Sequence, residues 1–310
     1  PLKNMLTSKF HLLKKGITLE NKLLLGKEVA NHTVLELHDI ILSLKNSGIV
    51  PKLAAILIGD NPASKIYVNS KAKFFANNGC DSETFKFGAN VSQDEVLDRI
   101  EKLNNDESVH GILVQLPLPD KFDNEKVLSA ISPDKDVDGF HPYNVGRLFS
   151  GSPDFIPCTP HGIIKILDFY NIETSGKNCV VIGRSNIVGK PMFALLSQKF
   201  NRGNCTVTMC HSRTKNLSFY TANADIIVSA IGVPDFLSSE MIKEGAVVID
   251  VGINRVDDKT AKKGYRIVGD VDLDSMIDKV SYITPVPGGV GPMTIAMLLY
   301  NTVISAESKN

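Results

Sequence analysis

The sequence predicts an α/β protein of two domains, in which a first α/β unit is followed by a doubly wound domain of the kind that binds nucleotides. The chain has 310 residues, of which 43% are hydrophobic, and this suffices for two cores. Apolar runs alternate with amphipathic segments, which is the pattern of βαβ units around a parallel sheet. In the second half, five apolar runs with helical spacers indicate a doubly wound sheet.

The first unit is expected to begin near residue 23. Residues 1–22 are rich in lysine, with Glu20 as the single acidic residue. They are faintly similar to a transit peptide but lack arginine, so we interpret them as a surface extension. Buried strands are predicted in KLAAILIGD (52–60) and HGILVQLPLP (110–119).

The second unit is expected after a loop, SGSPDFIPCTP (150–160). A final helix is predicted from Thr294 to about Glu307, and the pattern leaves open which domain it packs against. The five candidate strands of this unit are NCVVIG (178–183), CTVTMC (205–210), ADIIVSAIG (224–232), GAVVIDVG (245–252) and VSYITPVPGG (280–289).

Charge and cysteine usage exclude several classes of function. Thirty-four basic residues balance thirty-four acidic ones, so the net charge predicts no attraction to nucleic acid or to an anionic membrane, and a small-molecule partner is favoured. The five cysteines form no CxxC pair, and we find no signal peptide and no apolar run long enough to cross a bilayer. These features predict a soluble protein of a reducing compartment, the cytoplasm.

A short helix is predicted in NPASKIYVNSKAKFF (61–75), because an asparagine can cap it and a proline suits its first turn. At about 100° per residue, Lys71 lies on the same face as Tyr67, whereas Lys65 and Lys73 point away from it. Taken alone, the pattern favours an ordinary lysine whose stem covers apolar surface over a catalytic lysine.

A phosphate-binding loop is predicted in GRSNIVGKP (183–191), which joins an apolar strand to a helix. Backbone N–H groups at such a helix start attract phosphate. The Walker A pattern does not fit, because five residues separate the glycines and Pro191 follows Lys190, which argues against an NTPase. The dinucleotide pattern GxGxxG does not fit fully either, since Ser185 replaces its middle glycine.

The end of the next predicted strand, CHSRT (210–214), bears on the choice of cofactor. An acidic residue there binds the ribose 2′-hydroxyl of NAD, whereas a basic residue accommodates the 2′-phosphate of NADP. The chain offers His211, Ser212 and Arg213 and no carboxylate, which favours NADP. The alternative is an exposed turn that happens to be basic.

The segment DKDVDGFHPYNV (134–145) begins like a calcium-binding EF-hand loop. Its twelfth position is Val145, where the loop needs a bidentate glutamate, so no metal site is predicted. The segment is then either a solvated acidic turn or a place where one aspartate receives hydrogen bonds from a ligand.

Two further segments are candidates for ligand contacts. Gln115 follows an apolar strand in VQLPLP (114–119), at the edge of a parallel sheet where ligands usually bind, although an ordinary polar strand end is an equal alternative. The glycines of TPVPGGVGPMT (284–294) allow the backbone to approach a ligand closely.

The chain closely resembles the bifunctional methylenetetrahydrofolate dehydrogenase/cyclohydrolase family, known in bacteria as FolD, from about residue 24 to its end. The family usually begins with an Ile-Asp-Gly-Lys stretch, but Leu25 stands here in place of the aspartate, which leaves the first strand open. No motif of a formate-activating synthetase domain is present. The resemblance rests on YVNSK, VQLPLP, DKDVDGFHPYN, GRSNIVGKP, DVGIN and PVPGGVGPMT, which occur in this order.

The resemblance implies a folate-binding catalytic domain of residues 23–155 and 290–310, to which the C-terminal helix returns. It implies a Rossmann-type NADP-binding domain of residues 156–289 and a cleft between the domains that holds both reactions.

The resemblance also implies the roles of individual residues. Lys71 is then the catalytic lysine, Tyr67 lies against the folate, Gln115 contacts the lysine, and Asp138 anchors the pterin ring. The implied cofactor residues are Gly183, Arg184 and Ser185 at the phosphates, Ser212 and Arg213 near the 2′-phosphate, and Ile253 and Thr294 near the nicotinamide.

The function implied is the NADP-dependent oxidation of 5,10-methylenetetrahydrofolate to the methenyl cation, followed by hydrolysis to 10-formyltetrahydrofolate. The expected partners are tetrahydrofolate derivatives and a second copy of the chain in a homodimer, with no nucleic acid and no membrane. The alternatives are another two-domain dehydrogenase, acting on amino or hydroxy acids, and a folate- or nucleotide-binding protein without activity.

Overall fold

The computed structural model describes residues 19–261 and 264–309, so most of the predicted N-terminal extension lies outside the described part. The chain divides into two compact units. The three-stranded unit consists of Ala30–His161 and the chain from Thr294 onward, and the five-stranded unit consists of Gly162–Met293 with the described residues up to Val29. Three helices pass from one unit into the other: α2 (Gly26–Asn46), α7 (Cys158–Phe169) and α11 (Val290–Glu307).

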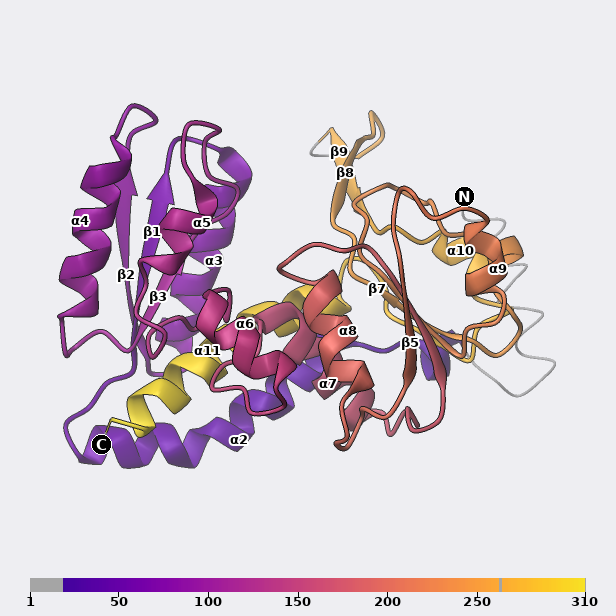
Figure 1. Cartoon of the computed structure of the whole chain (residues 1–310), viewed down its shortest axis with the longest axis horizontal. Helices are drawn as coiled ribbons and strands as arrows, with labels where there is room; N and C mark the ends of the chain where they lie inside the picture. The colour runs from indigo at the N-terminus through magenta and orange to yellow at the C-terminus, as the bar shows by residue number, and fades with distance from the viewer. Residues whose placement is uncertain (1–18, 262–263, 310) are drawn as a thin grey trace. The chain divides into compact units, whose positions relative to one another are not determined.

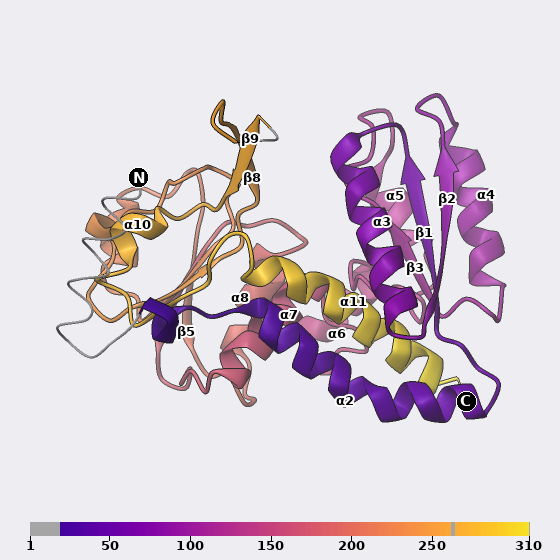
Figure 2. The same cartoon turned by 180° about the vertical axis from the view of Figure 1, so that it is seen from behind.

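The three-stranded unit holds a parallel sheet in the order β2-β1-β3. The chain leaves β1 toward one edge of the sheet and then crosses back over β1 to reach β3. Because such crossovers are right-handed, α3 and α4 cover opposite faces, as Figures 1 and 2 show. The elements are β1 (Lys52–Ile58), α3 (Pro62–Asn77), β2 (Asp81–Phe87), α4 (Gln93–Asn104), β3 (Gly111–Val114), α5 (Asn124–Ser129) and α6 (Pro142–Phe149).

Strand β1 is the centre of this unit and is buried on both faces. Its alternate residues Ala54, Ile56 and Ile58 pack with Val96 and Ile100 of α4 in one apolar cluster. The intervening residues of β1 are also buried, since the opposite face is covered as well. The burial on both faces explains why the strand reads as a continuous apolar run.

The five-stranded unit holds a second parallel sheet, in the order β10-β7-β6-β4-β5. Successive connections leave β4 in opposite directions, so the switch point of this doubly wound sheet lies between β4 and β6. The elements are η1 (Leu19–Lys22), β4 (Asn178–Ile182), α8 (Gly189–Ser197), β5 (Thr206–Cys210), α9 (Leu217–Thr221), β6 (Ile226–Ser229), η2 (Ser239–Met241), β7 (Val247–Asp250), β8 (Asn254–Asp257), β9 (Tyr265–Val268), α10 (Leu273–Met276) and β10 (Tyr282–Ile283).

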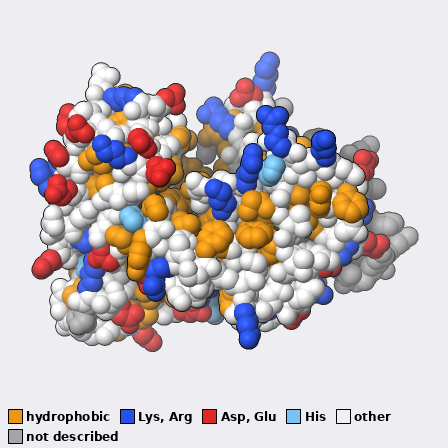
Figure 3. All heavy atoms as spheres, viewed as in Figure 1, with side chains coloured by type: hydrophobic (Ala, Val, Ile, Leu, Met, Phe, Trp, Pro, Cys, Tyr) orange, Lys and Arg blue, Asp and Glu red, His pale blue; other side chains and the backbone are white. Residues whose placement is uncertain are grey.

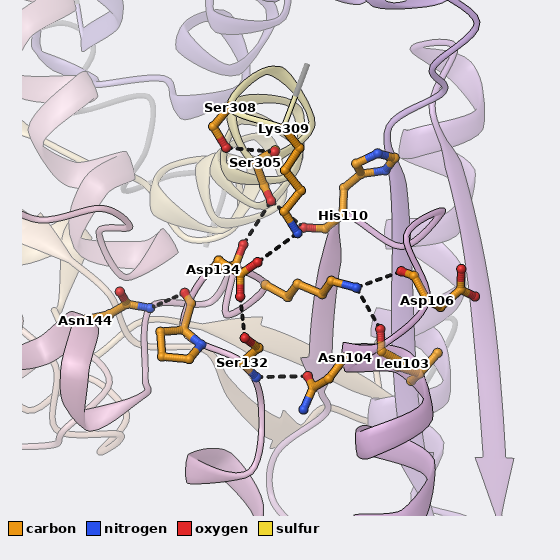
Figure 4. Close-up of polar contacts among 12 residues, drawn as sticks. Leu103, Asn104, Asp106, His110, Ser132, Asp134, Asn144, Ser305, Ser308 and Lys309 are labelled. Atoms are coloured by element: carbon orange, nitrogen blue, oxygen red, sulfur yellow. Dashed lines mark hydrogen bonds and ion pairs between the residues drawn. The ribbon is translucent and has the colours of Figure 1, made fainter.

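The C-terminal helix belongs, from Thr294 onward, to the three-stranded unit, which confirms the predicted return of this helix to the first domain. Near its end Ser305 Oγ donates to His110 O at 2.6 Å, and the Lys309 ammonium lies 2.9 Å from the Asp134 carboxylate. Figure 4 shows Ser305 and Lys309 meeting Asp134, which in turn contacts Ser132. Asn301 also donates to the Val137 carbonyl at 2.8 Å.

The predicted α/β fold with two parallel sheets is confirmed, and four details differ from the expectation. The last predicted strand is only two residues long, and α11 begins at Val290 rather than at Thr294. The edge strand β2 and the antiparallel pair β8-β9 were not predicted. The stretch before α2 makes a single parallel bridge, between Leu23 and Ile283, rather than a strand. No helix in the described part of the chain combines the length and apolar character needed to cross a bilayer.

Candidate active site

Helix α3 places a buried lysine at the three-stranded sheet. Asn61 caps the helix as predicted, because its Oδ1 accepts from Ala63 N at 2.9 Å and from Ser64 N at 3.2 Å. Lys71 is 8% exposed, and its ammonium donates to Gln115 Oε1 at 3.1 Å. A buried ammonium requires such partners, since its transfer from water is costly.

The other lysines of α3 behave as the helical spacing predicts. Lys65 is exposed and pairs with Asp60 at 2.7 Å, and Lys73 is also exposed. Tyr67, one turn before Lys71, is 40% exposed, so its ring is open to contact with a ligand. The face of α3 that carries Tyr67 and Lys71 therefore combines an accessible ring with a buried ammonium.

Gln115 is fixed in the orientation that serves the lysine. It follows β3 directly, and its backbone N–H donates to Ile56 O at 2.9 Å, which extends the sheet by one bond. Its side-chain Nε2 donates to Leu116 O at 2.7 Å. The amide oxygen is thereby left to accept from Lys71.

Asp138 is the acidic member of this group. It is half-buried, and burial raises its pKa, while the charge of Lys71 and a hydrogen bond with Cys158 offset this only in part. The interaction with Lys71 brings the aspartate, lysine and glutamine into one polar group. A cation and a carboxyl close together in a half-buried place are the usual parts of a site for proton transfer or for binding a polar ring.

The three aspartates of the DKDVDG segment have separate partners. Asp134 is exposed and pairs with Lys309, whereas Asp136 is 1% exposed and accepts from Asn144 Nδ2 at 2.8 Å. Asp138 interacts with Lys71 as described. Among the described residues no group of three His, Cys, Asp or Glu side chains is placed to hold a metal ion.

The predicted phosphate loop follows β4 at the switch point of the five-stranded sheet. Gly183 has φ of +125°, and a Cβ there would overlap the Ala230 carbonyl oxygen, so the loop requires glycine. Ser185 Oγ accepts from Val188 N at 3.2 Å and from Gly189 N at 3.3 Å, which holds the loop against the start of α8. Arg184 is exposed beside it.

The end of β5 supplies the other predicted cofactor residues. Ser212 and Arg213 are exposed in a turn that is closed by a bond from Thr214 N to His211 O at 2.8 Å. The backbone N–H of Arg213 donates to His211 Nδ1 at 3.2 Å, and the residue is exposed. These donors and the glycine cradle fit a dinucleotide with a 2′-phosphate.

The two predicted nicotinamide residues lie in different units. Ile253 follows β7 in the five-stranded unit and is 50% exposed, an unusual degree for an isoleucine beside a buried strand. Thr294 belongs to the three-stranded unit, where its hydroxyl lies 2.9 Å from Thr159 Oγ1.

Sequence reasoning missed several buried polar residues around these groups, namely Asp136, Asn144, Cys158, Asp250 and Asp270. One signal was available, because Asp250 ends an apolar strand and a glycine, Gly252, follows two residues later, in the turn at the carboxyl end of a parallel strand. Asp270 gave no comparable signal, because its partners are distant in the sequence.

The fold and the groups described define a two-unit α/β enzyme of the dinucleotide-binding class. One unit carries a lysine, glutamine and aspartate group, and the other carries the phosphate loop of a doubly wound sheet.

The chain belongs to the tetrahydrofolate dehydrogenase/cyclohydrolase family, which confirms the family inferred from the motifs. The model of the family's catalytic domain matches residues 24–138, and that of its NAD(P)-binding domain matches residues 157–310.

Three relatives show the extent of the similarity. A bifunctional protein FolD from Chlorobium chlorochromatii is 53% identical over 92% of this chain and 98% of its own length. The crystal structure of a bifunctional FolD enzyme from Campylobacter jejuni is 52% identical, with a TM-score of 0.87 over 93% of this chain and 99% of its own. The FolD enzyme of Trypanosoma brucei, solved with NADP and an inhibitor, is 38% identical, with a TM-score of 0.88 over 93% of this chain and 97% of its own.

Proposed function

We propose that the protein oxidises 5,10-methylenetetrahydrofolate to 5,10-methenyltetrahydrofolate with NADP and hydrolyses the product to 10-formyltetrahydrofolate. The observation that carries the proposal is the buried Lys71 held by Gln115 and facing the charge of Asp138, in a chain that matches both domain models of the family. Relatives at about half identity over nearly the full chain are described as bifunctional.

Lys71 serves the hydrolysis. Water adds to the methenyl carbon and the ring then opens, so a proton must move from the water to the leaving nitrogen. The ammonium of Lys71 is positioned by Gln115 at 3.1 Å and is sheltered from bulk water, which suits it to hold and pass on that proton. We assign Gln115 to orienting the lysine.

Tyr67 and Asp138 bind the substrate. The Tyr67 ring, on the same face of α3 as Lys71, stacks against the folate, and its 40% exposure supports this assignment. Asp138 accepts hydrogen bonds from the polar edge of the pterin ring. The two residues orient the one-carbon unit relative to Lys71.

The residues of the five-stranded unit hold NADP, which is the oxidant and would accept a hydride. Gly183, Arg184 and Ser185 receive the phosphates at the start of α8. Ser212 and Arg213 bind the 2′-phosphate, and the exposed Ile253 orients the nicotinamide. The half-buried Thr294 of the three-stranded unit is the further residue that we assign to the nicotinamide.

The chain acts as a homodimer in the cytoplasm. The five-stranded unit exposes large apolar residues, among them Phe219 (62%) and Phe236 (42%), and Figure 3 shows hydrophobic side chains at the surface of this unit. The five cysteines are buried and free, which suits a reducing compartment.

The test is an assay of purified protein with methylenetetrahydrofolate and either NADP or NAD. The reaction is monitored through the absorbance of the reduced cofactor. We expect reduction with NADP and little with NAD. Amino and hydroxy acids serve as competing substrates in parallel samples. Turnover of one of these without turnover of the folate would establish a different two-domain dehydrogenase, and no turnover at all would establish a binding protein.

A further inference from the structure

Two buried carboxylates outside the predicted site occupy the cofactor edge of the five-stranded sheet. Asp250 is the last residue of β7 and is 3% exposed, and Asp270, two residues after β9, is fully buried. Buried carboxylates are retained only where donors compensate their desolvation. The hydrogen-bond donors to Asp250 and Asp270 show which loops the two carboxylates connect.

Backbone N–H groups satisfy the Asp250 carboxylate. Its Oδ1 accepts from Gly252 N and from Asp270 N, both at 2.9 Å, and its Oδ2 accepts from Val271 N at 3.0 Å. The first bond closes the turn that precedes Ile253. The other two fasten that turn to the chain after β9.

The Asp270 carboxylate fastens a second loop. Its Oδ2 accepts from Ile231 N at 2.8 Å and Gly232 N at 3.1 Å, directly after β6, and its Oδ1 accepts from Asn254 Nδ2 at 2.9 Å. The loops after β6 and β7 are thus joined through one side chain. Both lie at the carboxyl ends of parallel strands, where a doubly wound sheet binds its cofactor.

The glycines beside the pair show how closely it is packed. A Cβ at Gly252 would overlap Asp270 Oδ1, and a Cβ at Gly269 would overlap Asp250 Oδ2. Neither glycine has a positive φ, so close approach to the carboxylates explains the absence of a side chain.

We propose that Asp250 and Asp270 are positioning residues that fix the loop carrying Ile253 for hydride transfer. The proposal rests on the proposed function. Because the phosphates are held by the loop after β4, a shift of the Ile253 loop misplaces the nicotinamide and leaves most of the affinity for NADP in place. Hydride transfer depends on alignment, so a displacement of this kind lowers its rate. The hydrolysis uses residues of the other unit and needs no oxidant.

The test compares Asp250→Asn with Asp270→Asn and with the control Asp272→Asn, whose carboxylate caps α10. All three donors to Asp250 are backbone N–H groups that cannot turn, so its amide variant must set an NH2 group against at least one of them. For Asp250→Asn we expect the dehydrogenase kcat to fall at least about tenfold, with the Kd of NADP within about threefold and the cyclohydrolase rate within about twofold of the parent. For Asp270→Asn we expect a smaller loss, because Asn254 can rotate its amide to accept from the new NH2 group and loses only its bond to the Gly269 carbonyl at 3.1 Å. For Asp272→Asn we expect no loss.

Gly252→Ala provides a second variant that keeps both carboxylates. Its methyl group displaces the Ile253 loop, so we expect the same selective loss of dehydrogenase activity. An equal loss of both activities, or unchanged dehydrogenase activity in Asp250→Asn and Gly252→Ala, would overturn the proposal. A parent without dehydrogenase activity would instead refute the proposed function.

Discussion

Lys71 combines two properties that surface lysines of the same helix lack. It is 8% exposed, and its ammonium is directed to the oxygen of an amide whose own NH2 is bound elsewhere. Lys65 and Lys73 are exposed. The three lysines therefore provide a natural comparison between a positioned and an ordinary ammonium.

We predict that Lys71→Met lowers the cyclohydrolase rate by at least about a hundredfold, in the range typical of general acid–base groups. The rate is measured as the decay of methenyltetrahydrofolate absorbance without cofactor. Lys65→Met and Lys73→Met are matched controls on the other faces of α3 and should retain the parental rate. An equal loss in either control would contradict the assignment of Lys71.

Asp138 should bind the substrate and hold no metal. Asp138→Ala is expected to weaken folate binding, measured by titration with methenyltetrahydrofolate, because the pterin loses its acceptor. Calcium and a chelator should leave the activity of the parent unchanged. Inhibition by the chelator that added metal reverses would exclude this account of the DKDVDG segment.

The preference for NADP should depend on arginine. A charge-assisted hydrogen bond contributes about 1.5 to 3 kcal/mol, so one arginine accounts for roughly a ten- to hundredfold preference. Arg213→Ala or Arg184→Ala should raise the KM for NADP and leave that for NAD nearly unchanged. The measurement is the ratio of kcat/KM for the two cofactors, and an unchanged ratio in both variants would be inconsistent with the assignment.

Single residues could be predicted where their role depends on neighbours in the sequence. Lys71 could be distinguished from its neighbours because helical spacing alone separates their faces. Asp250 and Asp270 could not be paired, since they are distant in sequence and only the packing of β6, β7 and β9 brings their partners together. The sequence carries no periodic signal for a contact of that kind.

Among the elements, the strands that contain an apolar run were predicted, including the partly exposed edge strand β5, and the polar strands were not. β1 is buried along nearly its whole length, whereas β2 at the sheet edge has no fully buried residue and reads as DSETFKF. The pair β8-β9 is also half-exposed, and the guanidinium of Arg255 lies 4.0 Å from the ring centre of Tyr265 there. Strands of this kind lack the apolar run on which the prediction depended.

The loop between α5 and α6 holds a carboxyl group that couples folding to pH. Burial raises the pKa of Asp136 to about 7, although Asn144 and the N–H groups of His141 and Phe140 donate to it. A raised pKa means that the folded state binds the proton more tightly than the unfolded state. Asp136 therefore favours folding at low pH, and this contribution is lost as pH rises toward 7.

Asp136→Asn should remove this dependence. Between pH 5 and 7 the free energy of unfolding of the variant, relative to the parent, should rise with pH, with a slope of at most about 1.4 kcal/mol per pH unit that decreases toward pH 7. Asp134→Asn is the control. Burial alone would raise the pKa of Asp134, but its hydrogen bonds with Ser132 and Lys309 outweigh burial, and the net effect is a lowered pKa. The stability difference between this variant and the parent should therefore not change with pH between 5 and 7. The measurement is thermal or urea unfolding of each protein across the range, and a constant difference between Asp136→Asn and the parent would contradict the assignment.

At the scale of the whole molecule, the sequence predicted two α/β units and their order because each unit has its own series of apolar runs. The family followed from ordered motifs and was confirmed over residues 24–138 and 157–310. The hydrophobic periodicity did not show that the boundaries between the units fall within helices. The helices concerned, α2, α7 and α11, read as ordinary amphipathic or apolar segments. Their division depends on contacts that only the folded chain shows.

We expect one chain to carry out two consecutive reactions on the same folate. This expectation is tested most directly by incubating the purified protein with methylenetetrahydrofolate and NADP and measuring NADPH, methenyltetrahydrofolate and 10-formyltetrahydrofolate in the same sample. We expect one molecule of 10-formyltetrahydrofolate for each NADPH, with methenyltetrahydrofolate as a transient intermediate. If NADPH forms but methenyltetrahydrofolate accumulates and is hydrolysed no faster than in the absence of protein, the second reaction is not catalysed and the bifunctional assignment is wrong. The absence of NADPH would contradict the first reaction.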